Sequence, residues 1–435
     1  MQMKLLCAAD LHLGRQPTRI PEGLAQRAAE LTPLAAWRSL VETAIELQVD
    51  AVLLAGDVLD DDYDFYESFG DLSSGVERLV EAGIEVVAVS GNHDVEVLPR
   101  LARVVPRLRL LGRGGTWESV TVEAAGRRVH VVGWSFPGRS VTASPLPSLD
   151  LASLDLAPAP VIGLLHCDLD QSASIHAPVA FHELESARLD AWLLGHVHKP
   201  SDLEARPVGY LGSISAADPG EEGRRGAWLL TVAASGIELE PIALSPLRWE
   251  TVAVDISGMG EPAEVDARMI SAIEELAQRI ADGRGYLKAV GCRLHLTGRS
   301  RWRDEIVERV RRDDPRQVQV TAGSATFFVH DVKVLALPEV DLESVALGND
   351  PVALMARKLL LVRSSGSEER GPLLEEARQR LVRAGSVNQY KQLAKAAVSD
   401  EAVAAYLEAA ALRAIDVMEK RRSASEATQG EAERP

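Results

Sequence analysis

The amino-acid sequence predicts an α/β fold with a smaller second α/β domain and a helical C-terminal segment. Two observations lead to this prediction. From residue 1 to about residue 248, short apolar runs alternate with segments of helical periodicity, a pattern typical of a sheet covered by helices. From about residue 350 onward the chain is instead rich in Ala, Leu, Glu and Arg. With 435 residues, the chain is too long for one typical core, so we expect several domains.

The first domain is predicted to span residues 1–248. Helices are indicated between its first two strands, where Trp37 to Ile45 shows helical spacing, and again around Leu79. From about Thr116 to Val132 the pattern changes to short β-like runs around the turn Ala125-Gly126. A loop rich in Pro and Ser follows from about Pro137 to Pro160, and we expect it to be mobile and on the surface.

Five apolar runs of this domain each end in a potential metal ligand. The runs are residues 4–9, 51–55, 84–89, 161–165 and 191–194. The side chains that follow them are Asp10 and His12, then Asp57, then Asn92 with His93 and Asp94, then His166, and finally His196 with His198. Open α/β sheets place their ligands at the carboxyl ends of strands, so we expect these side chains to lie together. Oxygen and nitrogen donors without thiolate suit Mn²⁺, iron or Zn²⁺.

Leaving aside His93 and Asp94, the donors outnumber what one tetrahedral metal can use. Two metals about 3.5 to 4 Å apart, bridged by one carboxylate and a water, fit the number and suit phosphoester hydrolysis. We assign Asp57 as the bridge. Taken singly, Asp10 and Asp57 could cap helices and His166 could be a satisfied core histidine. The occurrence of all five groups at strand ends favours the metal site.

Composition restricts the class of protein. The formal charge of -17 argues against general coating of nucleic acid, since phosphate binding rests on Lys and Arg. Cys7, Cys167 and Cys292 are far apart and lie in apolar surroundings, so we interpret them as small buried hydrophobic residues. Neither a signal peptide nor a membrane-spanning stretch is evident, and we expect a cytoplasmic protein.

The second α/β domain is predicted over residues 249–340. Its strands and two helices, from about Glu261 to Ala281 and from Trp302 to Arg312, surround the densest basic cluster of the chain. The cluster consists of Arg293, Arg299, Arg301, Arg303, Arg309, Arg311, Arg312 and Arg316. Two interpretations stay open: a solvated face paired with Asp304, Glu305 and Glu308, or a contact surface for a phosphate backbone.

The C-terminal segment, residues 341–421, is predicted to be helical, with helices over Pro351–Leu361, Pro372–Ala384 and Glu401–Lys420. Its apolar side chains must fold back on the preceding domain or dock on a partner, and the sequence does not decide between these. Residues 422–435 are polar and rich in small side chains, so we expect a disordered tail.

The order Asp-x-His, Gly-Asp, Gly-Asn-His-Asp, His and Gly-His-x-His resembles the calcineurin-like metallophosphoesterase superfamily over residues 1 to about 240. The resemblance implies a four-layer α-β-β-α sandwich. It also implies two divalent metal ions, with Mn²⁺ expected and iron or zinc as alternatives. Asp10, His12, Asp57 and His198 would hold one ion, and Asp57, Asn92, His166 and His196 would hold the other. His176 and His182 match no ligand position.

Within the superfamily, the stretches Ala9 to Gly14 and Gly195 to Lys199 look like those of the SbcD-type DNA repair exonucleases. This resemblance implies a 3′–5′ exonuclease, with endonuclease activity as a further expectation, that acts on DNA ends or single-stranded regions as a homodimer. Residues 249–340 would form a capping domain, and residues 341–421 would dock on an SbcC-like coiled-coil ATPase. The acidic run Asp60 to Asp62 departs from the family pattern and argues against tight duplex binding.

As a hypothesis for the mechanism, His93 donates a proton to the leaving oxygen and Asp94 orients its ring. Two other functions remain open. One is a phosphoesterase for a small nucleotide or other small ester, which the acidic net charge permits. The other is a scaffold protein with a dead site, against which the complete set of candidate ligands argues.

Overall fold

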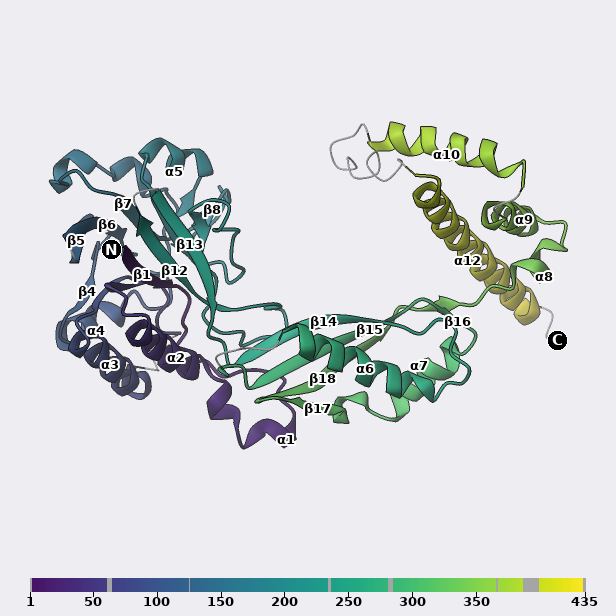
Figure 1. The fold of residues 1–435 in the computed structure, drawn as a ribbon, viewed down its shortest axis with the longest axis horizontal. Helices are drawn as coiled ribbons and strands as arrows, with labels where there is room; N and C mark the ends of the chain where they lie inside the picture. Colours follow the sequence, from purple (N-terminus) through teal and green to yellow (C-terminus); the bar gives the residue numbers. More distant parts are fainter. Residues whose placement is uncertain are drawn as a thin grey trace. The chain divides into compact units, whose positions relative to one another are not determined.

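The computed structural model describes residues 2–60, 65–124, 126–233, 236–280, 285–364, 367–385 and 399–432 (Figure 1). Asp61 and Asp62 of the acidic run and Ala125 of the predicted turn lie outside the described residues. The chain divides into two compact units. The first contains Met1–Val254, Ala263–Leu296 and Glu308–Lys333, and the second contains Asp255–Pro262, Thr297–Val307 and Val334–Pro435.

Two sheets form the centre of the first unit. The six-stranded sheet has the order β13 (Gly236–Ala243), β12 (Gly226–Ala233), β1 (Met3–Ala8), β2 (Ala51–Ala55), β3 (Glu85–Val89) and β4 (Leu108–Leu110). The five-stranded sheet has the order β11 (Val208–Tyr210), β10 (Ala191–Gly195), β7 (Val161–His166), β6 (Arg127–Trp134) and β5 (Trp117–Ala124). β1, β2 and β3 run parallel, as do β7 and β10, so the five strands that precede candidate ligands are neighbours in two parallel sets.

The alternation of side chains along β1 shows how the layers arise. Leu5 and Cys7 lie in a core that they share with Ile162 of β7, between the two sheets. Leu6 lies on the opposite face, in a core with helices α2 (Pro33–Glu46) and α3 (Phe65–Glu81). Successive strand residues point to opposite faces, so both faces of an apolar strand are buried.

The outer face of the five-stranded sheet forms a third core. Leu165 of β7 and Trp192 of β10 pack there with Leu184 of helix α5 (Phe181–Ala187). The order is therefore helices, sheet, sheet, helix, and the predicted α/β sandwich of four layers is confirmed. Cys7, Cys167 and Cys292 are buried free thiols, as the sequence predicts.

A third sheet follows in the chain, with the order β14 (Leu247–Asp255), β15 (Ala289–Thr297), β18 (Ala325–Val334) and β17 (Gln319–Ala322). The accompanying helices are α6 (Glu264–Arg279) and α7 (Arg303–Arg312), close to the predicted ranges. Trp249 and Phe328 of this sheet share a small core with Leu24 and Leu31 in the first unit. The second small α/β domain is therefore present.

Helices dominate the second unit: α8 (Leu342–Ala346), α9 (Pro351–Arg363), α10 (Arg370–Gly385) and α12 (Asp400–Ala432). They pack on one another, with Leu359 against Leu412 in one cluster and Leu374 against Val403 in another. α12 continues through the predicted tail as far as Ala432, so the disorder expected from residue 422 is wrong for residues 422–432. Alanine and glutamate favour extension of a helix that has already begun. Residues 433–435 lie outside the described residues.

Short elements complete the fold. They are α1 (Glu22–Ala25), η1 (Ala28–Leu31), α4 (Leu98–Val104), η3 (Leu146–Ser148), η4 (Leu151–Leu154), β8 (Asp168–Leu169), β9 (Pro178–Val179), β16 (Arg299–Ser300), η5 (Pro315–Gln317) and β19 (Leu337–Pro338). Within the described part of the chain, we find no helix with the length and apolar character that crossing a membrane requires.

Candidate metal centre

The loops after β1 and β2 run side by side and hold the first candidate ligands. The N–H of Asp10 donates to the carbonyl of Gly56 at 3.1 Å, and the N–H of His12 donates to the carbonyl of Asp57 at 3.0 Å. Further on, the N–H of Asp60 donates to the carbonyl of Leu13 at 3.3 Å. These bonds continue the pairing of the two strands beyond their ends, so the ligand side chains have fixed starting points.

Four of the candidate ligands have backbones in the left-handed region: Asp10 (φ 50°), His12 (φ 46°), Asp57 (φ 49°) and His196 (φ 104°). This conformation costs a residue other than glycine on the order of 1–3 kcal/mol and clusters at functional sites. One stabilising contact is visible at His196, whose backbone N–H lies 3.0 Å from a carboxylate oxygen of Asp10. The strain therefore coincides with the predicted site.

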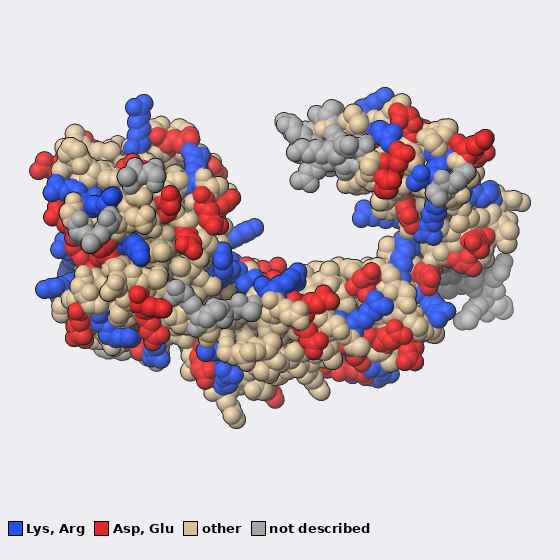
Figure 2. Space-filling view, in the orientation of Figure 1, with Lys and Arg blue, Asp and Glu red and all other residues tan. Residues whose placement is uncertain are grey.

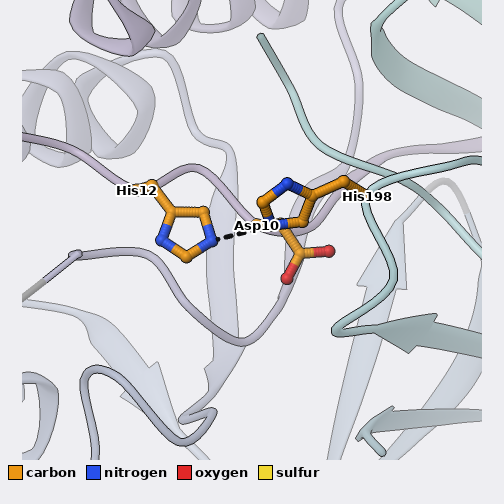
Figure 3. A group of neighbouring side chains, drawn as sticks. All are labelled: Asp10, His12 and His198. Carbon is orange, nitrogen blue, oxygen red and sulfur yellow. Dashed lines mark hydrogen bonds between the residues drawn. The ribbon is translucent and has the colours of Figure 1, made fainter. Parts of the chain in front are cut away.

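One group of donors consists of Asp10, His12 and His198, whose ligand atoms lie within 4.8 Å of one another. Figure 3 shows the rings of His12 and His198 facing each other, with the carboxylate of Asp10 beside them. The two Nε2 atoms are 3.1 Å apart. On the far side of each ring, Nδ1 of His12 lies 2.7 Å from Asp60, and Nδ1 of His198 contacts Glu221.

These contacts test whether a cation fits. Nδ1 of His198 forms a hydrogen bond with Glu221, and Nδ1 of His12 lies within ion-pair distance of Asp60. A proton on each Nδ1 suits these carboxylates, and both Nε2 atoms then present lone pairs. Two lone pairs 3.1 Å apart beside a carboxylate repel each other unless a positive charge lies between them. The donor set of this group therefore fits a divalent cation.

A second group consists of Asp57, His166 and His196. Nδ1 of His166 faces the carbonyl of Ala55 at 3.1 Å, and this contact assigns the proton to Nδ1. Nε2 of His166 then lies 3.3 Å from Asp57 Oδ2 and 3.2 Å from Asn92 Oδ1, both of which are acceptors. Three acceptors converge here too, and a cation fits this group for the same reason.

The pKa values of the second donor group reflect the negative charge that its carboxylate brings to the site. Burial works to lower the pKa of His166, but the charge of Asp57 and its hydrogen bond outweigh burial and raise that pKa to about 9. At His196, burial and the charge of His166 lower the pKa to about 4. The charge of Asp57 thus favours a positive charge at His166, at the position where the donor set fits a metal ion.

His93 and Asp94 lie beside the two groups, but their contacts differ from the predicted ones. Asp94 is fully buried and accepts from the backbone N–H groups of Val58 (2.7 Å) and Gly91 (2.8 Å). Nδ1 of His93 faces the carbonyl oxygen of Asp60 at 2.8 Å. We therefore correct the role predicted for Asp94: it holds two ligand loops together, and the contact that orients His93 comes from Asp60.

Three carboxylates near the centre were not among the predicted site residues: Asp60, Glu221 and Asp168, whose Oδ1 lies 3.4 Å from Nε2 of His196. His176, which matched no ligand position, has its ring centroid 4.9 Å from that of His196. Asp60 and Asp168 follow candidate ligands closely in the chain, a signal that could have found them. Glu221 offers no such signal, because only the fold brings it to His198.

Comparison with known proteins agrees with this geometry. Residues 3–200 match the family model of calcineurin-like phosphoesterases, and residues 249–335 match that of the middle domain of metallophosphoesterase YhaO. The chain is 30% identical to the uncharacterized metallophosphoesterase YhaO of Bacillus subtilis, over 58% of this chain and 62% of YhaO. It is 26% identical to the DNA double-strand break repair protein Mre11 of Haloferax volcanii, over 59% of this chain and 55% of that protein.

The chain thus spans less than two thirds of the length of either relative. Among solved structures, it is similar to the calcineurin-like phosphoesterase YfkN of Bacillus subtilis, with 10% identity, a TM-score of 0.37 and coverage of 65% of this chain and 99% of that one. Because that TM-score is low, the similarity to calcineurin-like phosphoesterases is argued from the family model, the order of the strands and the two donor groups. Residues 3–200 are therefore similar to the calcineurin-like phosphoesterases, and they carry both donor groups on a metallophosphoesterase fold.

Proposed function

We propose that the protein is a metal-dependent phosphodiesterase that acts on DNA as an SbcD-type nuclease, a 3′–5′ exonuclease with endonuclease activity as a further expectation. The observation that carries the hydrolytic part is the convergence of two donor groups, each arranged to surround a cation. The nucleic-acid part is supported by the similarity to relatives named for DNA double-strand break repair.

Each residue of the centre has a role in this proposal. Asp10, His12, Asp57 and His198 would hold one divalent cation, and Asp57, Asn92, His166 and His196 the other, with Mn²⁺ as the expected metal. When bound, the two cations supply an activated water and stabilise negative charge on the phosphate. In this assignment Asp57 would contribute to both ligand sets and would fix the spacing of the two cations.

His93 is placed to serve the leaving group. Its side chain is 46% exposed, whereas the side chains of His12 and His166 are 6% and 0% exposed, so a substrate can reach it. Because its Nδ1 faces the carbonyl of Asp60, Nε2 is the nitrogen left to meet the substrate. Nε2 can donate a proton only when both ring nitrogens are protonated. The leaving oxygen of the substrate would take the proton from Nε2, and the ring would become neutral.

The other domains support the proposal through the resemblance to SbcD-type nucleases. Residues 249–340 would cap the DNA site. The helices of residues 341–421 would dock on an SbcC-like coiled-coil ATPase, and the protein would act as a homodimer. Several apolar side chains on these helices are exposed and would be available to such a partner: Leu354, Val382, Tyr406 and Val417.

The arginine cluster of the second α/β domain favours a second candidate function. Most of its arginines contact carboxylates: Arg293 with Glu222, Arg299 with Asp416, Arg303 with Asp304, Arg309 with Asp266, Arg311 with Glu308, Arg312 with Asp313, and Arg316 with Asp314. Figure 2 shows basic and acidic side chains intermixed on this part of the surface.

A face of paired charges attracts phosphate less than a free basic patch. Together with the net charge of -17, this favours a phosphodiesterase for a small nucleotide or other small ester as the second candidate. Exposed ion pairs are worth only about 0–1 kcal/mol each, so they do not prevent a phosphate backbone from displacing the carboxylates.

Hydrolysis of two substrates distinguishes the candidates. With Mn²⁺ present, we expect the protein to degrade a linear duplex labelled at its 5′ end and to hydrolyse bis-p-nitrophenyl phosphate, with both activities lost in His93→Ala. The control is His182→Ala, which removes an exposed histidine and should keep both. Hydrolysis of the small ester with untouched DNA, also after addition of an SbcC-like ATPase, would favour the second candidate.

A further inference from the structure

Four side chains form a row across one of the donor groups: Asp60, His12, His198 and Glu221. Asp60 contacts Nδ1 of His12 at 2.7 Å, the two Nε2 atoms face each other at 3.1 Å, and Nδ1 of His198 contacts Glu221. Both imidazoles of this group therefore have a carboxylate on the side away from the expected cation. We call these four residues the carboxylate–histidine row.

The second donor group is built differently. Nδ1 of His166 faces the neutral carbonyl of Ala55. Asp168 lies 3.4 Å from Nε2 of His196, beyond the usual length of a hydrogen bond. Of these two donor groups, both among the described residues, the group of Asp10, His12 and His198 is the one with a carboxylate in close contact behind each imidazole.

Backbone hydrogen bonds hold the Glu221 carboxylate and the main chain of Asp60. Glu221 accepts from the N–H of Asp218 at 3.1 Å, and its own N–H donates to the carbonyl of Asp218 at 2.9 Å. The N–H of Asp60 donates to the carbonyl of Leu13, which ties Asp60 to the loop that carries His12. The side chains of Glu221 and Asp60 are 12% and 31% exposed, so neither rotates freely in solvent.

We propose that Asp60 and Glu221 are positioning residues that hold His12 and His198 with Nδ1 protonated, so that both rings present Nε2 to the same divalent cation. A carboxylate behind a metal-binding imidazole fixes its tautomer and its orientation and strengthens it as a donor. Asp60 has a second connection, because its backbone carbonyl faces Nδ1 of His93. Its side chain thus serves a ligand of the metal, and its backbone serves the expected proton donor.

This inference rests on the metal-dependent part of the proposed function and not on the substrate. The test therefore measures metal binding. A negative result would overturn the positioning role of Asp60 and Glu221 and would leave open whether DNA is the substrate. Metal-free protein is titrated with Mn²⁺ by calorimetry. The wild type is compared with Asp60→Asn, Asp60→Ala, Glu221→Gln and Glu221→Ala, and with Glu222→Ala as the control.

We expect two sites in the wild type. Each Ala variant should lower the affinity of one site by about 10- to 100-fold and leave the other site unchanged. The amide variants keep an acceptor and lose the charge, so they should fall between the wild type and the Ala variants. Glu222 is the matched control because it adjoins Glu221 but contacts Thr251 and Arg293 instead of a ligand. Wild-type Mn²⁺ affinity in folded Asp60→Ala and Glu221→Ala would overturn the proposal.

A second measurement needs no variant. In protein labelled with ¹⁵N at histidine and loaded with diamagnetic Zn²⁺, the ring nitrogens report which atom carries the proton. We expect the rings assigned to His12 and His198 to carry a proton on Nδ1 and to bind the metal through Nε2. Metal-bound Nδ1 on either ring would overturn the proposal. Thermal unfolding in EDTA then separates a loss of affinity from a loss of fold in any variant.

Discussion

The carboxylate of Asp57 accepts a hydrogen bond of 3.0 Å from the backbone N–H of His93. Asp57 follows β2 and His93 follows β3, and these strands are parallel neighbours. The bond therefore joins the residue expected to bridge two cations to the residue expected to donate a proton. Because the contact uses the backbone of His93, the imidazole can be removed without removing the bond to Asp57.

Replacement of His93 by Ala should lower turnover and spare metal binding. A positioned general acid contributes about 10²- to 10⁴-fold, so we expect a loss of that size in kcat for bis-p-nitrophenyl phosphate. The Mn²⁺ content, measured by mass spectrometry after gel filtration, should equal that of the wild type. A variant with unchanged kcat would show that His93 has no catalytic role.

Replacement of Asp57 by Ala should, in contrast, reduce metal binding. Asp57 is buried and lies 3.3 Å from the ligand nitrogen of His166, and it is the carboxylate that both donor groups share in our assignment. We expect the variant to retain fewer than two Mn²⁺ ions through gel filtration and to lose activity as a consequence. Two ions retained at wild-type affinity would remove Asp57 from the ligand set.

The positions of the ligands were predictable because each follows an apolar run, and parallel strands bring such ends to one edge of a sheet. The residues that contact these ligands from behind were not predictable in this way. Glu221 meets His198 through a loop that returns from β11, and no periodicity of the sequence marks that approach. Asp94 was predicted to orient the ring of His93, whereas its oxygens accept from the backbone of Val58 and Gly91.

Two glycines of helix α3 should respond oppositely to replacement by alanine. A Cβ at Gly75 would lie 2.5 Å from Nε1 of the buried Trp37, whereas a Cβ at Gly70 would meet no atom within 4 Å. Overpacking costs about 1–3 kcal/mol, so Gly75→Ala should lower the free energy of unfolding by that amount. Gly70→Ala should raise it by about 0.5–1 kcal/mol, because alanine loses less entropy in a helix. Urea denaturation measures both, and a stabilised Gly75→Ala would contradict the packing of α3 on α2.

The pH dependence of stability should contain a contribution from His330. Burial, and next the positive charge of Arg293, lower the pKa of His330 to about 4 from an ordinary value of 6.5. The unfolded chain then binds a proton at a higher pH than the folded chain does. This contribution to stability is complete above about pH 6.5 and is lost as the pH falls toward 4.

Replacement of His330 by Asn should therefore reduce the loss of stability between pH 7 and pH 4.5, measured by urea denaturation at both values. The control is His182→Asn, since His182 is exposed, and it should keep the wild-type difference. An equal loss of stability in His330→Asn and the wild type would contradict the assignment.

The two central layers of the fold were predictable because both faces of their strands are buried, which produces continuous apolar runs. Some ion-pair partners of the arginine cluster were not predictable from the sequence. Its carboxylate partners include Asp266 and Asp416, which lie far away in the sequence. The end of α12 was missed because composition alone does not fix where a helix of Ala and Glu stops.

The central claim is that two cations share one carboxylate at the ends of these strands. Crystals soaked in Mn²⁺ and measured at the manganese absorption edge test it directly. We expect two anomalous peaks, one beside Asp10, His12 and His198 and the other beside Asn92, His166 and His196, with Asp57 between them. A single peak, or two peaks that leave Asp57 without a metal contact, would contradict the account.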